Sequence, residues 1–268
     1  MKNLDDIRES HTQFHGAWRF FARSSPTGEV LERPEVSIAS SNVTWAMMNA
    51  AFLPSPVETE EALERAAATA AAYFVPKGRG WMLALCEDQV SPRLRERAGE
   101  LFAPHGLKLA LVATGMVAER LAPPLRPPPA MDIRPATSTE VRHHLADINA
   151  RCYDVPLVVG REAFDVPALY TGDGKGYVGL FQGEAATSAA VIRVDDVAYI
   201  AMVATLPSYR QRGGAEAVMR HALAEAHRAW GVERTVLHAT PAGLPVYLRM
   251  GYRPVTRFHF YMAAPQGQ

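Results

Sequence analysis

The sequence predicts an α/β fold, with a mixed sheet flanked by helices in the second half of the chain and an α+β arrangement in the first half. Three observations predict it. Short apolar runs typical of strands alternate with helical periodicity, hairpin turns occupy the middle of the second half, and a strand-helix-strand unit follows them. With 268 residues, of which 48% are hydrophobic, the chain is long enough for one large domain or two smaller ones.

The first half alternates strand and helix signals. The run Ser55-Pro-Val-Glu58 supplies a cap, a proline suited to the first helical turn and a glutamate three residues after the cap, so we expect a helix to open here. Gly106 after an amphipathic stretch predicts a helix C-terminus. The predicted elements are strand material in 35–53, interrupted at 40–42, a helix to about 74, a strand at 81–86, a helix at 92–102 and a strand at 107–113.

A proline cluster divides the chain near its middle. Five of the 20 prolines fall within residues 123–129. Proline fixes φ and has no N–H group, so this segment is predicted to be an extended linker. The predicted organisation is a first domain at 1–121, a linker at 122–130 and a second domain at 131–268. A proline-rich ligand for a partner module is the other interpretation, although it calls for a longer or repeated motif.

The second half carries the clearer alternation. Residues 137–140 form a second capping box, which predicts a helix as far as Cys152. Turn pairs at 183–184 and 195–196 separate three β-rich runs. The predicted elements are a strand at 131–134, that helix, a helical segment at 161–170, strands at 177–182, 185–194 and 197–204, a helix from 215 to about 230, a strand at 234–239, a further helix and a last strand near 257–262.

Charge and composition exclude several classes of function. The 28 basic and 28 acidic side chains cancel, whereas a nucleic-acid-binding protein usually carries a basic surplus, so no nucleic-acid partner is expected. Apolar stretches run to only about ten residues, half of a membrane span, so no membrane association is expected. The two cysteines and the lack of a signal segment indicate a cytoplasmic protein. His143 and His144 are adjacent and point in different directions on a helix, and no metal site is expected.

The segment 203–216 leaves an apolar strand, turns at a proline and enters a helix whose apolar residues share one face. Gly213 and Gly214 therefore stand at a helix N-terminus, where the first N–H groups have no partner within the helix and the macrodipole is positive. Arg210 and Arg212 add positive charge, so the turn suits a phosphate or pyrophosphate. On the residues alone, a flexible turn with solvated arginines is an equal interpretation. The Walker and dinucleotide-binding glycine patterns are both missing.

The second half resembles the GNAT superfamily of acyl-CoA N-acyltransferases at three places, in the family's order. Arg-x-x-Gly-x-Ala at 210–215 fits the family's pyrophosphate loop, and Val-x-x-x-Pro at 203–207 precedes it in the usual place. Tyr-x-x-x-Gly-Tyr at 247–252 resembles the second signature, a tyrosine four residues before Gly-Phe or Gly-Tyr. Residues 133–137 resemble the family's first strand. The resemblance covers about 135 residues and implies a GNAT-like fold for this half.

The resemblance implies acetyl-CoA as the co-substrate. The pantetheine arm would follow the strand that ends at Met202 and Val203, and Thr240 and Tyr247 would complete the contacts. The pyrophosphate would lie on one loop, formed by Arg210, Gln211, Arg212, Gly213, Gly214, Ala215 and Glu216.

Two residues are implied to act in catalysis. The Val203 amide can face the thioester oxygen and stabilise the oxyanion that forms when an amine attacks. Tyr247 falls where the family often keeps a general acid for the departing CoA thiolate. A buried aromatic side chain that packs its helix on the sheet is the other interpretation of Tyr247.

The match departs from the family at informative positions. Thr240 stands where many members have asparagine, and Gly243 replaces a common alanine. Residues 197–204 hold no carboxylate, although many relatives carry a glutamate base there, and an attacking amine must lose a proton. Three polar residues are candidate bases, none of them assigned: Asp154, Tyr199 and His238.

The expected function is N-acetyl transfer from acetyl-CoA to a primary amine of a small molecule or peptide, by direct attack in a ternary complex. A covalent route through Cys152 lacks an identifiable histidine partner. The alternative function is a non-catalytic acyl-CoA-binding or regulatory module, favoured by Thr240 and the missing strand carboxylate. Neither the acceptor nor the oligomeric state can be read from the sequence.

The first half shares a local pattern with the second. Residues 92–99 follow a strand much as residues 207–214 do, at a constant offset of 115. We therefore hypothesise that the first half is a degenerate GNAT-like domain without catalytic residues that shapes the acceptor pocket. A coincidental match is the alternative, since the two helices differ in length.

Overall fold

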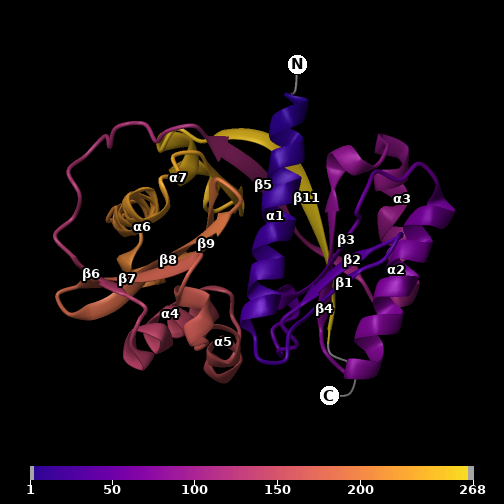
Figure 1. The fold of residues 1–268 in the computed structure, drawn as a ribbon, viewed down its shortest axis with the longest axis horizontal. Coiled ribbons are helices and arrows are strands. Elements are labelled where there is room, and N and C mark those ends of the chain that lie inside the picture. The colour runs from indigo at the N-terminus through magenta and orange to yellow at the C-terminus, as the bar shows by residue number, and fades with distance from the viewer. Residues whose placement is uncertain (1–2, 265–268) are drawn as a thin grey trace. The chain divides into compact units, whose positions relative to one another are not determined.

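The computed structural model describes residues 3–264, which fold as two compact units. The first unit holds the described residues up to Gly115, Ala239–Ala242, and those from Pro254 on, and the second holds Met116–His238 and Gly243–Arg253. Each unit contains parallel and antiparallel strand pairs with helices packed against them, which confirms the predicted α/β class (Figure 1).

The first unit opens with a long helix that the sequence analysis did not predict. Its helices and strands are α1 (Leu4–Ser24), β1 (Glu29–Glu32), β2 (Ser37–Ser40), β3 (Asn49–Phe52), α2 (Glu60–Phe74), β4 (Trp81–Cys86), α3 (Pro92–Phe102), most of β5 (Lys108–Ala118) and β11 (Arg253–Ala263). Short 3₁₀ turns occupy Ala46–Met48, Val75–Lys77, Glu87–Gln89 and Ala103–His105.

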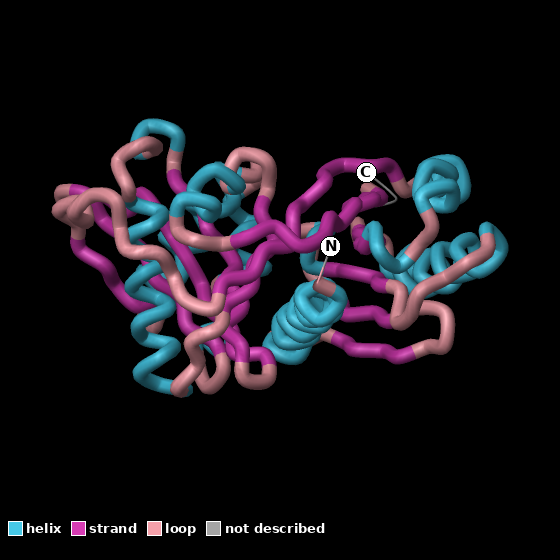
Figure 2. Tube along the Cα trace, turned by 90° about the horizontal axis from the view of Figure 1, so that it is seen from above, coloured by secondary structure: helices cyan, strands magenta, loops and turns pink. Residues whose placement is uncertain are grey.

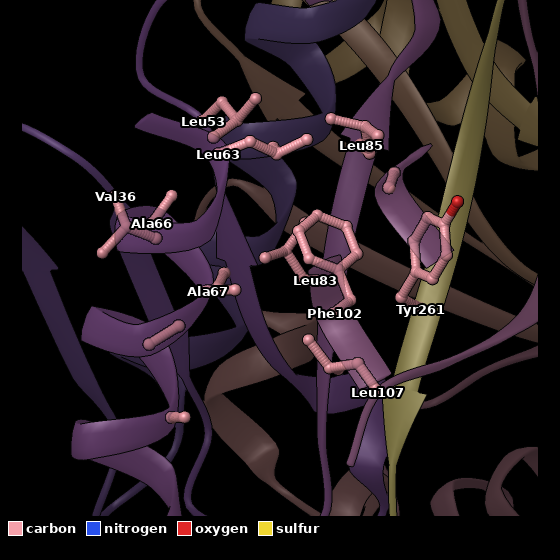
Figure 3. Close-up of a cluster of buried hydrophobic side chains, with 14 of the residues drawn as sticks. Val36, Leu53, Leu63, Ala66, Ala67, Leu83, Leu85, Phe102, Leu107 and Tyr261 are labelled. Carbon is pink, nitrogen blue, oxygen red and sulfur yellow. The ribbon is translucent and has the colours of Figure 1, made fainter. Parts of the chain in front are cut away.

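The strands of the first unit bury both faces. On one face, side chains of β4 and β11 meet α2 and α3, as in the cluster of Leu83, Phe102 and Tyr261 (Figure 3). The alternate residues point the other way, where Phe14 of α1 stacks on Phe260 with ring centroids 5.5 Å apart. In Figure 2, α1 and the other two helices accordingly lie on opposite sides of these strands. Such two-sided burial explains why β4 reads as a continuous apolar run.

The second unit follows the order predicted from the sequence. Its helices and strands are β6 (Asp132–Pro135), α4 (Thr139–Cys152), α5 (Leu157–Phe164), β7 (Gly174–Phe181), β8 (Glu184–Val194), β9 (Val197–Thr205), α6 (Gly214–Trp230), β10 (Thr235–Ala239) and α7 (Leu244–Arg249). Two 3₁₀ turns, Pro167–Tyr170 and Pro207–Tyr209, complete it. Helix α6 covers one face of β7–β9, and α4 with α5 covers the other (Figure 1).

The same succession of pairings occurs in both units. Strands β1, β2 and β3 are antiparallel neighbours, and β3 then pairs in parallel with β4 after the crossover helix α2. Strands β7, β8 and β9 repeat this pattern, and β9 pairs in parallel with β10 after α6. The shared topology supports the hypothesis of a GNAT-like first half, which stays a prediction.

The offset of 115 residues is wrong, because it aligns the wrong helices. Helix α6 connects two parallel strands, as α2 does, whereas α3 follows β4 as α7 follows β10. The segment 53–59 before α2 is therefore the counterpart of the glycine turn before α6. It contains Pro54 and Pro56, which have no N–H to offer an anion.

Two predicted caps are also wrong, the first by four residues and the second by one. Helix α2 is capped by Thr59 rather than Ser55, because the Val57 N–H donates to Gln89 O at 2.9 Å and keeps that stretch extended. Helix α4 is capped by Ser138, whose hydroxyl accepts from the Val141 N–H, rather than by Thr137.

The proline segment is free of helix and strand, and its first residue is tied to the second unit. The Ala122 N–H donates to Met250 O at 2.8 Å, and Arg220 of α6 donates to Ala122 O at 2.8 Å. Strand β11, which the predicted boundaries assign to the second domain, pairs with β4 of the first unit, with Tyr261 opposite Leu83. The boundaries at 121 and 131 stay a prediction.

Candidate functional site

Strand β9 contains a β-bulge at the point where the thioester was predicted to lie. The register passes from Ser188↔Ala204 to Ala190↔Ala201, so Met202 and Val203 together stand opposite one residue of β8. Met202 has a φ of 52°, in the left-handed region. A bulge leaves its extra residue outside the ladder of hydrogen bonds, so this stretch can offer backbone groups to a ligand.

A buried polar chain holds the bulge in place. The Ser188 hydroxyl donates to Met202 O at 2.9 Å, and Asn149 of α4 donates its Nδ2 to Ser188 Oγ at 3.0 Å. Asn149 and Ser188 are both almost fully buried. Buried polar groups of this kind specify one geometry when they are satisfied. Sequence reasoning missed both residues, because no spacing links a helix residue to a strand residue 39 positions away.

The parallel pairing of β9 with β10 ends next to the bulge. Within the described chain, its register runs from Thr235↔Ala198 to Leu237↔Ile200, while β9 continues to Thr205. The carboxyl ends of parallel strands are where open α/β sheets bind their ligands. The bulge therefore lies on β9 just beyond the last pair that it forms with β10.

Helix α6 begins in the glycine turn, as predicted. Gly213 is its N-cap with a φ of 80°, which favours glycine, and Gln211 before it has a φ of 63°. Gly214 is buried, and a Cβ on it would lie 3.2 Å from the Thr187 side chain. The two positions therefore require glycine for different reasons: Gly213 for its backbone conformation and Gly214 for close packing on β8.

The N-terminus of α6 differs from those of α1, α2, α3 and α4. Each of those four helices has a cap side chain that accepts from a first-turn N–H, whereas Gly213 provides none. Orphan N–H groups at a helix start favour an anion, helped by the macrodipole. The carboxylate of Glu216 in the first turn is paired with Arg220 at 2.8 Å. Gly214 and Ala215 complete the predicted loop.

The two predicted loop arginines have different surroundings. Arg210 donates its Nε to Thr205 O at 3.1 Å, which ties the loop to the end of β9. The Arg212 guanidinium lies over the Tyr209 ring, 5.1 Å from its centroid. Both side chains are exposed, so both can add positive charge near the start of α6.

Tyr247 is buried against the start of its own short helix. A Cβ on Gly243 would lie only 2.8 Å from Cε2 of Tyr247 and 3.3 Å from its hydroxyl oxygen. The ring also meets Tyr252 edge-on at 6.0 Å between centroids. Burial, together with the nearby Tyr153 and Tyr252, raises the pKa of Tyr247, so its hydroxyl keeps its proton at neutral pH. Gly243 therefore leaves the space that the ring occupies.

The structure brings together two of the three candidate bases. The Tyr199 hydroxyl and Nδ1 of His238 are 3.0 Å apart, across β9 and β10. Burial raises the pKa of Tyr199 well above its ordinary value, and charges on Tyr153 and Tyr247 raise it further. Asp154 instead is exposed at the end of α4, with a φ of 54°.

Cys152 is poorly suited to covalent catalysis. Its thiol donates to Thr205 O at 3.4 Å, and burial raises its pKa although Arg210 opposes the shift. A nucleophilic cysteine needs a lowered pKa to be a thiolate. The geometry does not favour a covalent acyl-enzyme.

Thr240 follows β10 directly, after Ala239.

Among residues 3–264, no group of three or more His, Cys, Asp or Glu side chains is placed to hold a metal ion. No helix in that part of the chain is long and apolar enough to cross a membrane.

Comparisons with known proteins concern the family and the fold. The model of the acetyltransferase (GNAT) family matches residues 142–252. A GCN5-related N-acetyltransferase from Kribbella flavida is 19% identical with a TM-score of 0.68, covering 97% of this chain and 96% of that one. A functionally unknown conserved protein from Staphylococcus epidermidis is 14% identical with a TM-score of 0.65, covering 88% and 93%.

A GCN5-related N-acetyltransferase-like protein from Streptococcus suis is 14% identical with a TM-score of 0.57, covering 94% and 98%. Likenesses at these identities show the shared fold, which extends over both units. Among curated proteins, no sequence matches the chain.

Proposed function

We propose, from the match of residues 142–252 to the model of the acetyltransferase (GNAT) family, that the protein transfers an acetyl group from acetyl-CoA to a primary amine of a small molecule or peptide. One observation carries the proposal: the bulge at Met202 and Val203 is followed within the same connection by a glycine turn that leaves the N-terminus of α6 uncapped. A thioester at the bulge and a pyrophosphate at the N-terminus of α6 would then belong to one acetyl-CoA molecule.

The proposed acetyl-CoA site follows the connection from β9 to α6. The pyrophosphate would bind the backbone amides from Gln211 to Glu216, with charge from Arg210 and Arg212. The pantetheine would lie along β9 at Met202 and Val203, and Thr240 would contact it from the end of β10. We propose direct transfer in a ternary complex, since the raised pKa of Cys152 argues against an acylated thiol.

The proposed chemistry uses one backbone group and one side chain. The Val203 N–H would donate to the thioester oxygen as negative charge develops on it, and loss of one such donor typically costs about 100-fold in rate. Tyr247 would donate its proton to the CoA sulfur. Its pKa lies above the thiol value of about 8.5, so the proton must move as the C–S bond breaks rather than before.

A binding experiment tests the pyrophosphate site. Gly213→Asp places a side chain on a left-handed backbone and a negative charge at the proposed anion position, so we expect acetyl-CoA affinity to fall at least about tenfold by calorimetry. Gly183→Asp is the matched control, because Gly183 is an exposed turn glycine with a φ of 88° and no atom within 4 Å of an added Cβ. Equal affinity of the two variants would show that CoA does not bind at α6.

A turnover experiment tests the enzymatic role. Wild-type protein would be mixed with acetyl-CoA and a panel of primary amines, and thiol release followed with a chromogenic disulfide. We expect amine-dependent release that Tyr247→Phe reduces about 100-fold, within the range of general acid catalysis. Tight acetyl-CoA binding without release across the panel would instead indicate a non-catalytic acyl-CoA-binding module.

We also propose a cytoplasmic location. Both cysteines, Cys86 and Cys152, are free thiols in the described structure. Free thiols suit a reducing compartment.

A further inference from the structure

An attacking amine must lose a proton, and no group of the site has so far been assigned to take it. Primary amines are mostly protonated at neutral pH, so transfer requires a proton acceptor. Strand β9 carries no carboxylate between Val197 and Thr205. The acceptor must therefore come from another side chain than a β9 carboxylate.

We propose that Tyr199 and His238 act together as this acceptor, with the Tyr199 hydroxyl passing a proton from the amine to Nδ1 of His238. The proposal rests on the proposed acetyl transfer.

The placement of the pair supports this role. Tyr199 precedes Val203 by four residues on β9, and His238 follows Leu237, the last residue of β10 that pairs with β9. The two polar atoms are 3.0 Å apart, within hydrogen-bond distance. His238 therefore lies at the carboxyl end of β10, where parallel α/β sheets bind ligands, and Tyr199 meets it from within β9.

The proton transfer balances without any other reactant. The substrate ammonium passes one proton to Tyr199 Oη while the Tyr199 hydroxyl proton moves to His238 Nδ1, so the tyrosine is unchanged, an imidazolium forms and the amine becomes neutral. The freed nitrogen lone pair makes the C–N bond, and the C–S bond electrons leave with sulfur, which takes the proton of Tyr247. The acylated nitrogen then loses its second proton through water to the Tyr247 phenolate, and the imidazolium releases its proton to water, so one proton is released overall.

The two side chains suit different parts of the relay. The raised pKa of Tyr199 keeps its hydroxyl protonated, so the tyrosine conducts a proton rather than storing a charge. A neutral imidazole has one ring nitrogen that accepts a proton and becomes an imidazolium when it does, so His238 can take the proton that Tyr199 passes on. The titratable groups that act on Tyr199 are Tyr153 at the end of α4 and Tyr247 of α7.

Two variants separate the relay from simple packing. Tyr199→Phe removes the conducting hydroxyl, and His238→Asn keeps a side-chain amide for Tyr199 but cannot take up a proton. The controls are Tyr177→Phe and His221→Asn, since Tyr177 and His221 form another contacting Tyr–His pair of the same unit, with ring centroids 4.8 Å apart. Full-length proteins would be assayed with acetyl-CoA and the most reactive panel amine, after thermal unfolding has shown that each variant folds.

The expected result is a loss of about 100-fold in kcat for each relay variant, with the KM for acetyl-CoA within about threefold of wild type. The double variant should be no slower than either single variant, because the two groups act as one unit. In the wild type, kcat/KM should fall toward low pH in part because a protonated His238 cannot accept a proton. This part of the fall should be absent in His238→Asn. High pH should restore part of the rate of both variants, because an amine that is already neutral needs no acceptor before it attacks.

Two results would overturn the relay. If Tyr199→Phe or His238→Asn keeps kcat within about threefold of the control variants, the proton takes another route, while wild-type thiol release still supports acetyl transfer. If the wild type releases no thiol with any panel amine, the acetyl transfer proposal and the relay fail together. If one of the two relay variants does not fold, the other is compared with the controls alone, and its pH profile decides whether the relay operates.

Discussion

Gly243 gives the sharpest test of how the proposed acid is positioned. Its backbone is ordinary, with φ −81° and ψ −28°, so replacement by alanine brings no backbone strain. The added Cβ would stand 2.8 Å from Cε2 of Tyr247, whereas 3.4 Å is the start of ordinary contact. The Tyr247 ring must therefore move by roughly 0.6 Å, the difference between these distances, although it is buried and meets Tyr252 edge-on.

The magnitude follows from two opposing effects. Gly→Ala at a compatible position stabilises by about 0.4–1 kcal/mol, because the unfolded chain loses freedom. Overpacking of a buried ring costs about 1–3 kcal/mol. We expect Gly243→Ala to lower the free energy of unfolding by about 1 kcal/mol, as the net of these two terms. The displaced hydroxyl should also lower kcat about tenfold, since small misplacements of catalytic groups are costly.

The assay combines urea unfolding with thiol release. Gly99→Ala is the matched control, because Gly99 lies inside α3 with no atom within 4 Å of an added Cβ, so this variant should gain stability and keep its activity. In a Tyr247→Phe background, Gly243→Ala should cause no further loss of kcat. An unchanged or raised stability of Gly243→Ala, with full activity, would refute the packing of Tyr247 on Gly243.

Three further predictions concern the rest of the structure. Burial lowers the pKa of His11 to about 4 from 6.5, so the unfolded state binds more protons than the folded state below pH 6.5, and the free energy of unfolding falls as the pH falls. Between pH 7 and pH 5, the free energy of unfolding of His11→Gln, measured in urea, should therefore fall by about 2 kcal/mol less than that of the wild type. Equal losses in the two proteins would contradict this. A Cβ on Gly160 would lie 2.7 Å from that of Ala150, so Gly160→Ala should lower the free energy of unfolding by about 1–3 kcal/mol, whereas a stable variant would show that α5 can move away from α4. Asn149→Leu removes the donor to Ser188, so it should lower the free energy of unfolding by about 1–3 kcal/mol and reduce the rate of thiol release. An unchanged rate would show that the bulge keeps its geometry without this donor.

Local signals predicted the elements that local interactions decide. Helix α6 is bracketed by Gly213 and Gly231, both in the left-handed region, and its predicted bounds agree with the structure to about a residue. Helix α1 was missed because polar residues, among them Ser10 and Gln13, lie on its buried side between the apolar ones and obscure the periodicity. The cap at Ser55 failed because strand-like pairing of Val57 with Val90 competes with helix formation there.

The candidate site divides in the same way. The glycine turn could be found from the sequence because its glycines, arginines and helix are contiguous, and the family resemblance added Tyr247. Met202 carries no sequence signal for its left-handed φ, since the bulge depends on the register with β8. The room beside Gly243 depends on which way the Tyr247 ring turns, which is a matter of packing.

By itself, the sequence determined the α/β class, the order of most strands and helices, and the helix N-terminus at Gly213, because these depend on interactions within about one helical turn or one hairpin. Only the tertiary structure decided that β11 pairs with β4, and that Tyr199 meets His238. Both depend on contacts between residues far apart in the chain, 39 positions in the case of Tyr199 and His238. Such contacts are selected by packing of the whole unit, and no local pattern specifies them.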